Sequence, residues 1–172
     1  MILSVHATFG AAVASLVPTH PGLAFCLGFV SHLALDAIPH QDYDLLSVSS
    51  GENRTMQNID SQEKKKRRLR DVRLVSFDAL IGFTLASIFF FNPVYPWIFF
   101  LGALGAVLPD FFTFLFLILR YKPLVIFYNW HSNFFHSKID LKIGQLTGII
   151  LQFCTLVILL AVLFEVKYLA LI

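Results

Sequence analysis

This sequence has few charged residues and few cysteines. Charged side chains make up 14% of the 172 residues, whereas a typical soluble domain carries about 25%. The two cysteines, Cys26 and Cys154, lie far apart, each in an apolar run. This spacing gives no disulfide framework, and we expect both to be buried as small hydrophobic side chains. An ordinary water-soluble domain is excluded by this composition.

Several common catalytic motifs are also missing. The sequence contains no Gly-rich phosphate loop, no Gly-x-Ser-x-Gly nucleophile elbow and no His-Glu-x-x-His zinc motif. Ser31 and Ser137 each adjoin a histidine, but nothing in their surroundings indicates an activated serine. Any catalytic chemistry must therefore come from a different set of side chains.

Long apolar runs dominate the sequence. It is 57% hydrophobic, with 19 phenylalanines, and a helix crosses the hydrocarbon layer with about 20 mostly apolar residues. The first two runs are short and joined by a Pro-Thr-His-Pro turn, so they could form a shallow hairpin instead of two full spans. We predict an all-α polytopic membrane protein, one integral membrane domain over 1–172 with about five helices packed as a bundle. The predicted helices cover 2–17, 22–38, 74–91, 95–119 and 143–164.

A polar, basic segment separates the second run from the third. We expect 41–73 to be a flexible basic loop, with 8 of the 13 Lys and Arg residues between Arg54 and Arg73. Four more flank the loop between the fourth and fifth runs. The positive-inside rule places both loops and the N-terminus on the cytoplasmic side of the membrane. The run at 64–70 is expected to face solvent or lipid headgroups; nucleic-acid binding is the alternative.

Ionisable residues interrupt the apolar runs. His32 and Asp36 are four residues apart and so share one helix face, although each costs about 2.5–3.5 kcal/mol at the centre of a membrane helix. Asp110 lies ten residues before Arg120, about 15 Å inside the membrane. The orientation brings these groups to one side of the membrane with five of the six histidines. We therefore predict a metal site with the ligands His6, His32, Asp36, Asp110, His131 and His136.

The chemistry of this set points to a borderline divalent ion. Imidazole and carboxylate without thiolate suit zinc first, or another first-row ion such as manganese, with one or more ions bound. A metal would offset the cost of burying the carboxylates, and an open position on it would activate water for attack on an ester or phosphoester. Asp78 is predicted to act as general base or as a further ligand.

Each of these residues also has a purely structural interpretation. His32 and Asp36 could be a hydrogen-bonded pair, and Asp110 could satisfy backbone groups freed by Pro109. Asp78 could cap the third helix or pair with Arg73. The remaining polar residues have similar roles open to them: His40 at a helix end, Asp42 and Asp44 in solvent, and His20 in a turn. The proximity of several such residues, rather than any single one, supports a metal site.

Four short motifs resemble the membrane-bound metal-dependent hydrolase family, whose members include an SOS-regulated inner-membrane protein of enteric bacteria. Its Gly-x-x-Ser-His-x-x-x-Asp helix is matched from Gly28 through His32 to Asp36, and its Pro-Asp segment by Pro109-Asp110. Its His-x4-His-Ser segment is matched at 131–137, and His6 matches the N-terminal His helix by position. The family is more distantly similar to zinc-dependent phospholipase C and single-strand nucleases, which implies a multinuclear zinc site for phosphodiesters.

This sequence departs from the family pattern in two ways. The Ser-His helix precedes the Pro-Asp segment, although it usually follows it. Phe112 stands where the family has a second Asp, and Thr113 replaces its His. Asp78, His40 or Asp42 could substitute for the missing ligand; otherwise the site holds fewer metals or none.

Two functions remain open from the sequence. The first is a membrane-embedded metal-dependent hydrolase for a phosphoester or lipid-linked substrate, with its His/Asp metal site at the cytoplasmic interface. Membrane lipids would surround it, and the resemblance implies a bacterial-type inner membrane. The second is a non-catalytic metal-binding or transporter-like membrane protein. The outer halves of the predicted helices are apolar apart from Thr and Ser, which argues against a polar path through the membrane.

Overall fold

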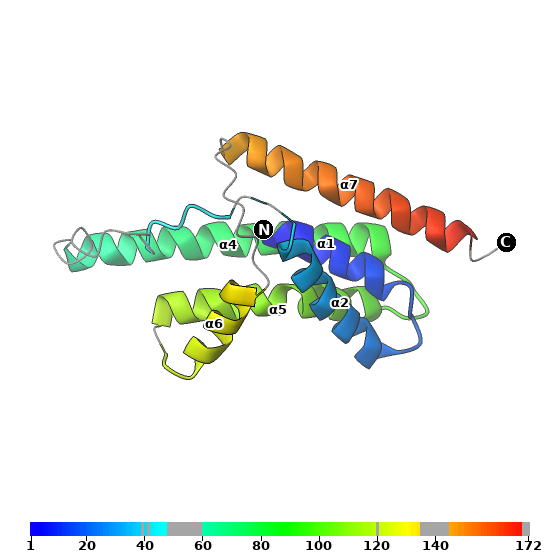
Figure 1. Cartoon of the computed structure of the whole chain (residues 1–172), viewed down its shortest axis with the longest axis horizontal. Helices are drawn as coiled ribbons and strands as arrows, with labels where there is room; N and C mark the ends of the chain where they lie inside the picture. Colours follow the sequence, from blue (N-terminus) through cyan, green and yellow to red (C-terminus); the bar gives the residue numbers. More distant parts are fainter. Residues whose placement is uncertain (39, 41, 48–59, 120, 135–144, 170–172) are drawn as a thin grey trace.

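The computed structural model is all-helical over the residues that it describes, which are 1–38, 40, 42–47, 60–119, 121–134 and 145–169. Figure 1 shows the arrangement of the helices and the two ends of the chain. The described helices are α1 (Leu3–Ala14), α2 (Pro21–Asp36), α4 (Ser61–Phe90), α5 (Ile98–Leu119), α6 (Leu124–Phe134) and α7 (Gln145–Leu169).

The predicted helical bundle is confirmed, and so is its membrane character. Among the described helices, three are long and apolar enough to cross a membrane, namely α4, α5 and α7. The two shorter apolar helices, α1 and α2, have 12 and 16 residues, about 18 and 24 Å at 1.5 Å per residue. Both are shorter than the roughly 30 Å hydrocarbon layer. They form a helical hairpin packed against the longer helices.

The basic run was predicted to lie in a loop, but the structure places it in the first turns of α4. Gln, Glu, Lys and Arg are strong helix formers. The negative charge of Glu63 lies in the first turn, where it interacts favourably with the positive end of the helix dipole. The Nε atom of Arg67 donates a hydrogen bond to Glu63 one turn earlier, at 3.0 Å. A helix of 30 residues is about 45 Å long, so its basic part extends beyond the hydrocarbon layer. Of the remaining predicted loop, 41 and 48–59 lie outside the described residues, whereas 42–47 are described.

Helix α5 is the centre of the bundle, with α1, α2, α4 and α6 packed against it. Small residues allow this close approach. A Cβ atom added to Gly102 would meet the carbonyl oxygen of Gly10 on α1, and one added to Gly28 on α2 would meet the carbonyl oxygen of Gly102. Such contacts between small residues are typical of closely packed membrane helices.

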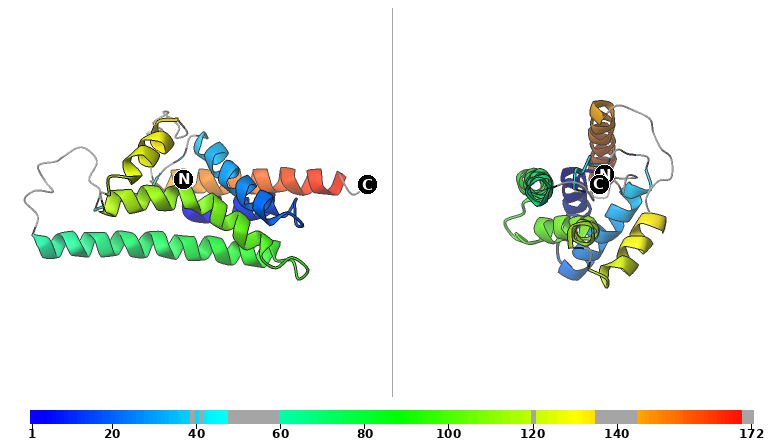
Figure 2. Two further views of the ribbon diagram at one scale, coloured as in Figure 1. Left: turned by 90° about the horizontal axis from the view of Figure 1, so that it is seen from below. Right: turned by 90° about the vertical axis from the view of Figure 1, so that its left-hand side faces the viewer.

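Proline interrupts α5 just before its acidic residue. Pro109 lies inside the helix, where it cannot donate the backbone hydrogen bond to the residue four positions earlier. Figure 2 shows α5 changing direction along its length, as expected for an internal proline. Asp110 lies 12 residues after Ile98 and 9 before Leu119, or about 18 Å and 14 Å from the two ends. Its carboxylate therefore lies near mid-depth of this span.

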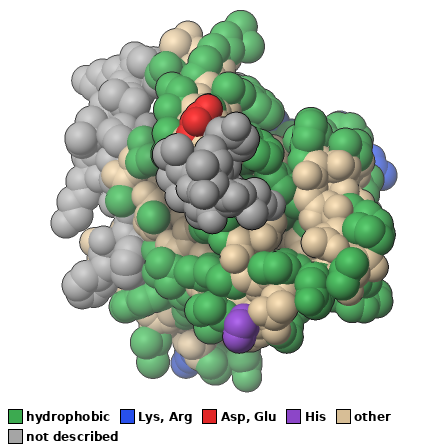
Figure 3. Space-filling model, turned by 90° about the vertical axis from the view of Figure 1, so that its right-hand side faces the viewer, with side chains coloured by type: hydrophobic (Ala, Val, Ile, Leu, Met, Phe, Trp, Pro, Cys, Tyr) green, Lys and Arg blue, Asp and Glu red, His purple; other side chains and the backbone are tan. Residues whose placement is uncertain are grey.

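The lipid-facing surface is strongly apolar. Large side chains project outward from the long helices, including Phe77, Ile88 and Val157, each more than 60% exposed. Cys26 and Cys154 are also exposed, so the prediction that they are buried is wrong; they lie on outward helix faces, where lipid rather than protein supplies an apolar environment. Figure 3 shows the end of the molecule opposite the basic residues, where hydrophobic side chains predominate and few are charged.

Helix α6 was not predicted, because its 11 residues are too few to span a membrane and the segment was interpreted as a loop. It packs against α5 through aromatic rings: Phe127 contacts Phe112, with centroids 5.4 Å apart, and Tyr128 contacts Phe116 at 4.7 Å. Its opposite face is open, with Ile126 77% exposed. This packing orients the last turn of α6, which carries His131, toward the centre of the bundle.

Candidate functional site

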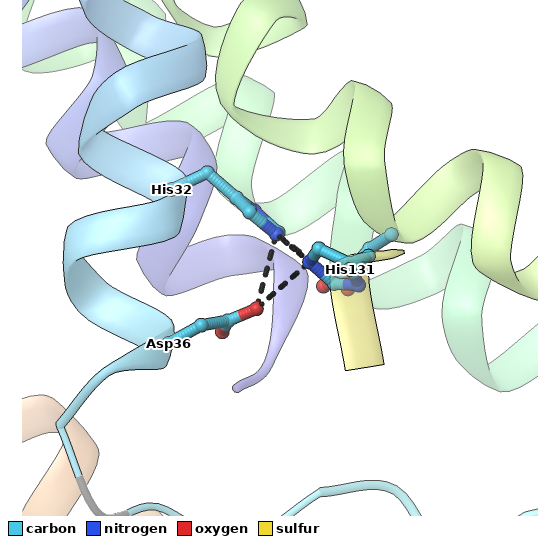
Figure 4. A group of neighbouring side chains, drawn as sticks. His32, Asp36 and His131 are labelled. Atoms are coloured by element: carbon cyan, nitrogen blue, oxygen red, sulfur yellow. Dashed lines mark hydrogen bonds and ion pairs between the residues drawn. The ribbon is translucent and has the colours of Figure 1, made fainter. Parts of the chain in front are cut away.

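Four ionisable side chains from three helices meet at one point. His32 and Asp36 come from α2, Asp110 from α5 and His131 from α6, and one ligand atom of each lies within 4.8 Å of all the others. His32, Asp36 and His131 are fully buried, and the side chain of Asp110 is 18% exposed. Figure 4 shows His32, Asp36 and His131 pointing toward one another.

The distances between these atoms resemble the edges of a coordination polyhedron. His32 Nε2 and His131 Nε2 are 2.9 Å apart, and each lies 3.1 Å from Asp36 Oδ2. Asp110 Oδ1 lies 3.8 Å from His32 Nε2. A tetrahedral zinc site with bonds of 2.0–2.1 Å has edges of about 3.3 Å. Two imidazoles and two carboxylates at this spacing fit a divalent ion such as zinc.

His6 on α1 adds a third imidazole to the cluster. Its Nε2 atom lies 3.1 Å from Asp36 Oδ1 and 3.8 Å from Asp110 Oδ2. Its ring lies against that of His32, with centroids 4.0 Å apart. The side chain is fully buried, yet neither ring nitrogen has a hydrogen bond among the described residues. Because buried polar atoms are normally hydrogen-bonded, a buried imidazole without a hydrogen bond is a further feature expected of a metal ligand.

Neighbouring residues orient His131. His131 Nδ1 lies 3.3 Å from the hydroxyl oxygen of Thr113 on α5, and its ring stacks on Phe127 at 6.0 Å. A ring in which Nδ1 carries the proton and donates to Thr113 has a lone pair on Nε2, the atom that faces the cluster. Thr113, the residue at the position of a histidine in the family pattern, therefore contacts a predicted ligand.

The structure brings together five of the six predicted metal ligands, and His136 lies outside the described residues. Asp78, the predicted general base, contacts a different set of groups. Its Oδ2 atom accepts hydrogen bonds from the backbone N–H of Ser4, at 3.0 Å, and from the hydroxyl of Tyr43. These contacts tie α4 to α1 and to the segment after α2, so in this structure Asp78 holds the surroundings of the site in place.

Tyr43 was missed by the sequence analysis. Its hydroxyl accepts a hydrogen bond from the backbone N–H of Leu3, at 2.8 Å, and donates one to Asp78. Burial, and then the neighbouring Asp78 carboxylate, raise the pKa of Tyr43 above its ordinary value. The phenol therefore stays protonated and acts as the donor to Asp78. No local sequence pattern distinguishes this tyrosine, because its partners Leu3 and Asp78 lie on α1 and α4, far from it in the sequence.

Two other buried polar residues were also missed. Asp71 on α4 accepts hydrogen bonds from the backbone N–H groups of Leu46 and Ser47, at 3.3 and 2.6 Å, and so fixes the segment after α2 to α4. Gln152 on α7 accepts one from the N–H of Ile2 at 3.0 Å. A single Gln in the middle of an apolar run is a signal that could have identified this contact, since uncapped N–H groups at the start of α1 need acceptors.

A cavity of about 660 Å³ lies beside the cluster. Asp110 is part of its wall, together with residues of α4, α5, α6 and the segment 42–46. The wall is amphiphilic: Val75, Phe114 and Leu117 are apolar, whereas Arg67 and Tyr43 offer hydrogen-bond donors. Arg67 and Val75 are eight residues apart on one helix, so the cavity extends along about 12 Å of α4. It joins the buried cluster to the basic end of the molecule.

Comparisons with protein-family models, with curated proteins and with solved structures found no match to this chain.

Proposed function

We propose that this protein is a membrane-embedded, metal-dependent hydrolase that acts on a phosphoester, with an amphiphilic or lipid-linked substrate. The observation that carries the proposal is the cluster of buried His and Asp side chains near mid-depth of α5, beside an amphiphilic cavity. Ionisable groups are costly at this depth and usually serve a function there. The resemblance to membrane-bound metal-dependent hydrolases stays a prediction that agrees with this proposal.

The residues of the cluster and of the cavity wall would have different roles. His32, Asp36, Asp110 and His131 would hold a divalent ion, zinc in the first instance, which supplies an activated water and stabilises negative charge on the phosphoryl oxygens. In hydrolysis, the water oxygen forms a bond to phosphorus, one P–O bond breaks, and the water proton passes to the leaving alcohol. The cavity walls would align the substrate, with apolar side chains against its hydrocarbon part.

Arg67 gives the cavity a preference for anionic substrates. Its guanidinium has five N–H donors, of which the Nε group donates to Glu63 at 3.0 Å. Lys64, Lys65 and Lys66 precede it on the same exposed part of α4. A basic helix end attracts anionic lipid headgroups, so it would concentrate such substrates at the mouth of the cavity. We place this end on the cytoplasmic side by the positive-inside rule.

Packing next to the cluster argues against the alternative of ion transport. One helical turn beyond His6 and His32, Gly10 and Gly28 approach Gly102 so closely that a Cβ atom on any of the three would clash with backbone. The described helices leave no polar route there toward the other side of the membrane. The remaining alternative is a metal site without catalytic activity, and the following test distinguishes it from a hydrolase.

The test combines metal analysis with activity. The full chain, purified in detergent and loaded with zinc, is assayed against phosphate monoesters and diesters, both water-soluble and lipid-linked. We expect metal-dependent release of phosphate or of a phosphorylated headgroup, abolished by Asp36→Ala and retained in His20→Ala, whose side chain is exposed. Bound zinc without turnover would favour a structural metal site; activity that survives both chelation and Asp36→Ala would overturn the proposal.

A further inference from the structure

The cavity beside the cluster has two polar ends that lie far apart. Asp110 lines its inner end and Arg67 its outer end. Asp78 gives the level of the inner end on α4, because it accepts a hydrogen bond from the backbone N–H of Ser4, two residues before His6 in the cluster. Arg67 lies 11 residues before Asp78 on the same helix, which corresponds to about 16 Å. A molecule that fills the cavity therefore meets a different group at each end.

The wall between the two ends is apolar. Val75 lies between them along α4, and Phe114 and Leu117 follow Asp110 by about one and two turns of α5. Hydrocarbon that covers these side chains removes apolar surface from water, which is favourable. A ligand that is polar along its whole length would instead bury polar groups without partners there, at a cost in free energy. The middle part of a well-matched ligand is therefore hydrocarbon.

Two hydroxyl groups of α6 line the cavity near its inner end. They belong to Tyr128 and Ser132, which are four residues apart and so share one helix face. Ser132 directly follows His131, a member of the cluster. Neither hydroxyl makes a hydrogen bond to another described residue. Because a hydroxyl can donate to a phosphoryl oxygen, the inner end suits the phosphoester end of a substrate.

The outer end of the cavity suits a second anion. Arg67 is the only Lys or Arg among the described residues of the wall. Its Nε group donates to Glu63, and its two terminal nitrogens have no hydrogen-bond partner among the described residues. They offer the parallel donors that a carboxylate or phosphate accepts. Two carboxylates also line the wall, but Asp42 Oδ1 lies 2.8 Å from the amino group of Met1, and Asp44 is exposed, where solvent ions screen its charge.

The direction of the cavity disfavours a lipid of the bilayer as substrate. Asp110 lies about 14 Å from the end of α5, whereas the phosphates of bilayer lipids lie outside the hydrocarbon layer of about 30 Å. The acyl chains of such a lipid point to the middle of the membrane, but the cavity leads from the cluster toward the basic end of the molecule. A bilayer lipid would have to turn over to place its phosphate at the cluster and its chains along the cavity.

We infer that the substrate is a single-chain amphiphile with an anionic group at each end. Its phosphoester lies at the cluster, a carboxylate or second phosphate lies at Arg67, and one hydrocarbon chain lies between them along Val75, Phe114 and Leu117. This substrate class rests on the proposed function and narrows it. Arg67 is then the residue that selects for the second anion, whereas the neighbouring Arg68, which does not line the cavity, has no such role.

The experiment measures binding without using activity. The full chain in detergent, loaded with zinc, is titrated calorimetrically with alkylphosphonates of increasing chain length, whose C–P bond is not hydrolysed. Each length is measured with a terminal carboxylate and with a terminal methyl group. For chains that span about 16 Å, we expect the ratio of the two affinities to fall by about tenfold in Arg67→Gln, as is typical of a hydrogen bond to a charged group. The ratio should not change in Arg68→Gln, and uptake of the probes by micelles cancels between the two variants.

Three results would overturn the two-ended substrate. They are an unchanged ratio in Arg67→Gln, an equal fall in both variants, which would indicate general attraction by the basic run, and a carboxylate preference that does not depend on chain length. Phosphoesterase activity without the Arg67-dependent preference would contradict this substrate class alone. The preference without hydrolysis of the corresponding phosphate monoester would contradict the proposed function alone.

Discussion

The Nε2 atoms of His32 and His131 lie 2.9 Å apart, although 99 positions separate the two residues in the sequence. Both atoms also lie 3.1 Å from Asp36 Oδ2. Helix α6 brings His131 to α2 by packing its aromatic face on α5. The geometry of the site thus depends on a short helix that does not itself cross the membrane.

Neutralising Asp36 should abolish tight metal binding. The Asp36→Asn variant keeps the shape of the side chain but removes the charge that two or more histidines face. We expect its zinc affinity to fall by more than about 100-fold. Residues that only support ligands typically change metal affinity by about 10–100-fold. Zinc titration calorimetry measures the change. Asp60→Asn, in the exposed residue before α4, is the matched control and should bind zinc normally.

Metal removal should lower thermal stability. A ligand that binds only the folded chain stabilises it by about 2.7 kcal/mol when present at 100 times its Kd. We therefore expect chelation to lower the Tm of the detergent-solubilised chain, and added zinc to restore it. The Tm of His131→Ala should not respond to chelator. An equal response in His131→Ala would mean that metal binds elsewhere.

A methyl group at the helix crossing should destabilise the fold. In Gly28→Ala the new Cβ atom would overlap the backbone of Gly102 on α5, and overpacking of this kind costs about 1–3 kcal/mol. Gly22→Ala is the control, because nothing lies within 4 Å of its Cβ position; it should be neutral or slightly stabilising. Thermal unfolding in detergent compares the two, and equal Tm values would contradict the close packing.

Tyr43→Phe should lower the free energy of unfolding by about 1–3 kcal/mol, because it removes the donor to Asp78 and the acceptor of the Leu3 N–H. The raised pKa of Tyr43 in the folded chain adds a pH dependence. The stabilisation by the Tyr43 phenol is fully present below the pKa that tyrosine has in the unfolded chain, about 10. It is lost as the pH rises above that value toward the higher pKa of the folded chain. The stability difference between the two chains should therefore narrow in strongly alkaline solution; a constant difference would contradict a buried phenol.

Labelling should place the two ends of α4 on opposite sides of the membrane. In a chain whose two cysteines are replaced by serine, we introduce Lys65→Cys in the basic run or Val94→Cys in the turn after α4. A membrane-impermeant maleimide added to intact cells should modify Val94→Cys and spare Lys65→Cys, because we propose that the basic end is cytoplasmic. The reverse pattern would invert the proposed orientation.

Periodicity and charge were enough to predict the parts of the site that depend on one helix. His32 and Asp36 share a face by their spacing alone, and the depth of Asp110 follows from its distance to Arg120. His131 was predicted as a ligand, but the helix that carries it was not, because the 11 residues of α6 are too few for a span and its stability comes from packing on α5. Asp78 was predicted as a base because sequence shows its depth but not its hydrogen-bond partner, Tyr43.

The basic segment was predicted wrongly for a different reason. High charge density suggested a loop throughout 41–73, but the same Lys, Arg and Glu side chains are good helix formers. Once α4 is nucleated by its apolar half, extending it through Arg67 adds one hydrogen bond per residue. Asp71 then fixes Leu46 and Ser47 to this extension, a tertiary contact with no local signature.

The most direct test of the metal site is X-ray absorption at the zinc edge on the purified, zinc-loaded full chain. We predict nitrogen and oxygen scatterers at about 2.0–2.1 Å with the outer-shell pattern of imidazole, all lost in a chain that carries His32→Ala and Asp36→Ala together. A spectrum without imidazole scattering, sulfur ligation at about 2.3 Å, or no change in the double variant would contradict it.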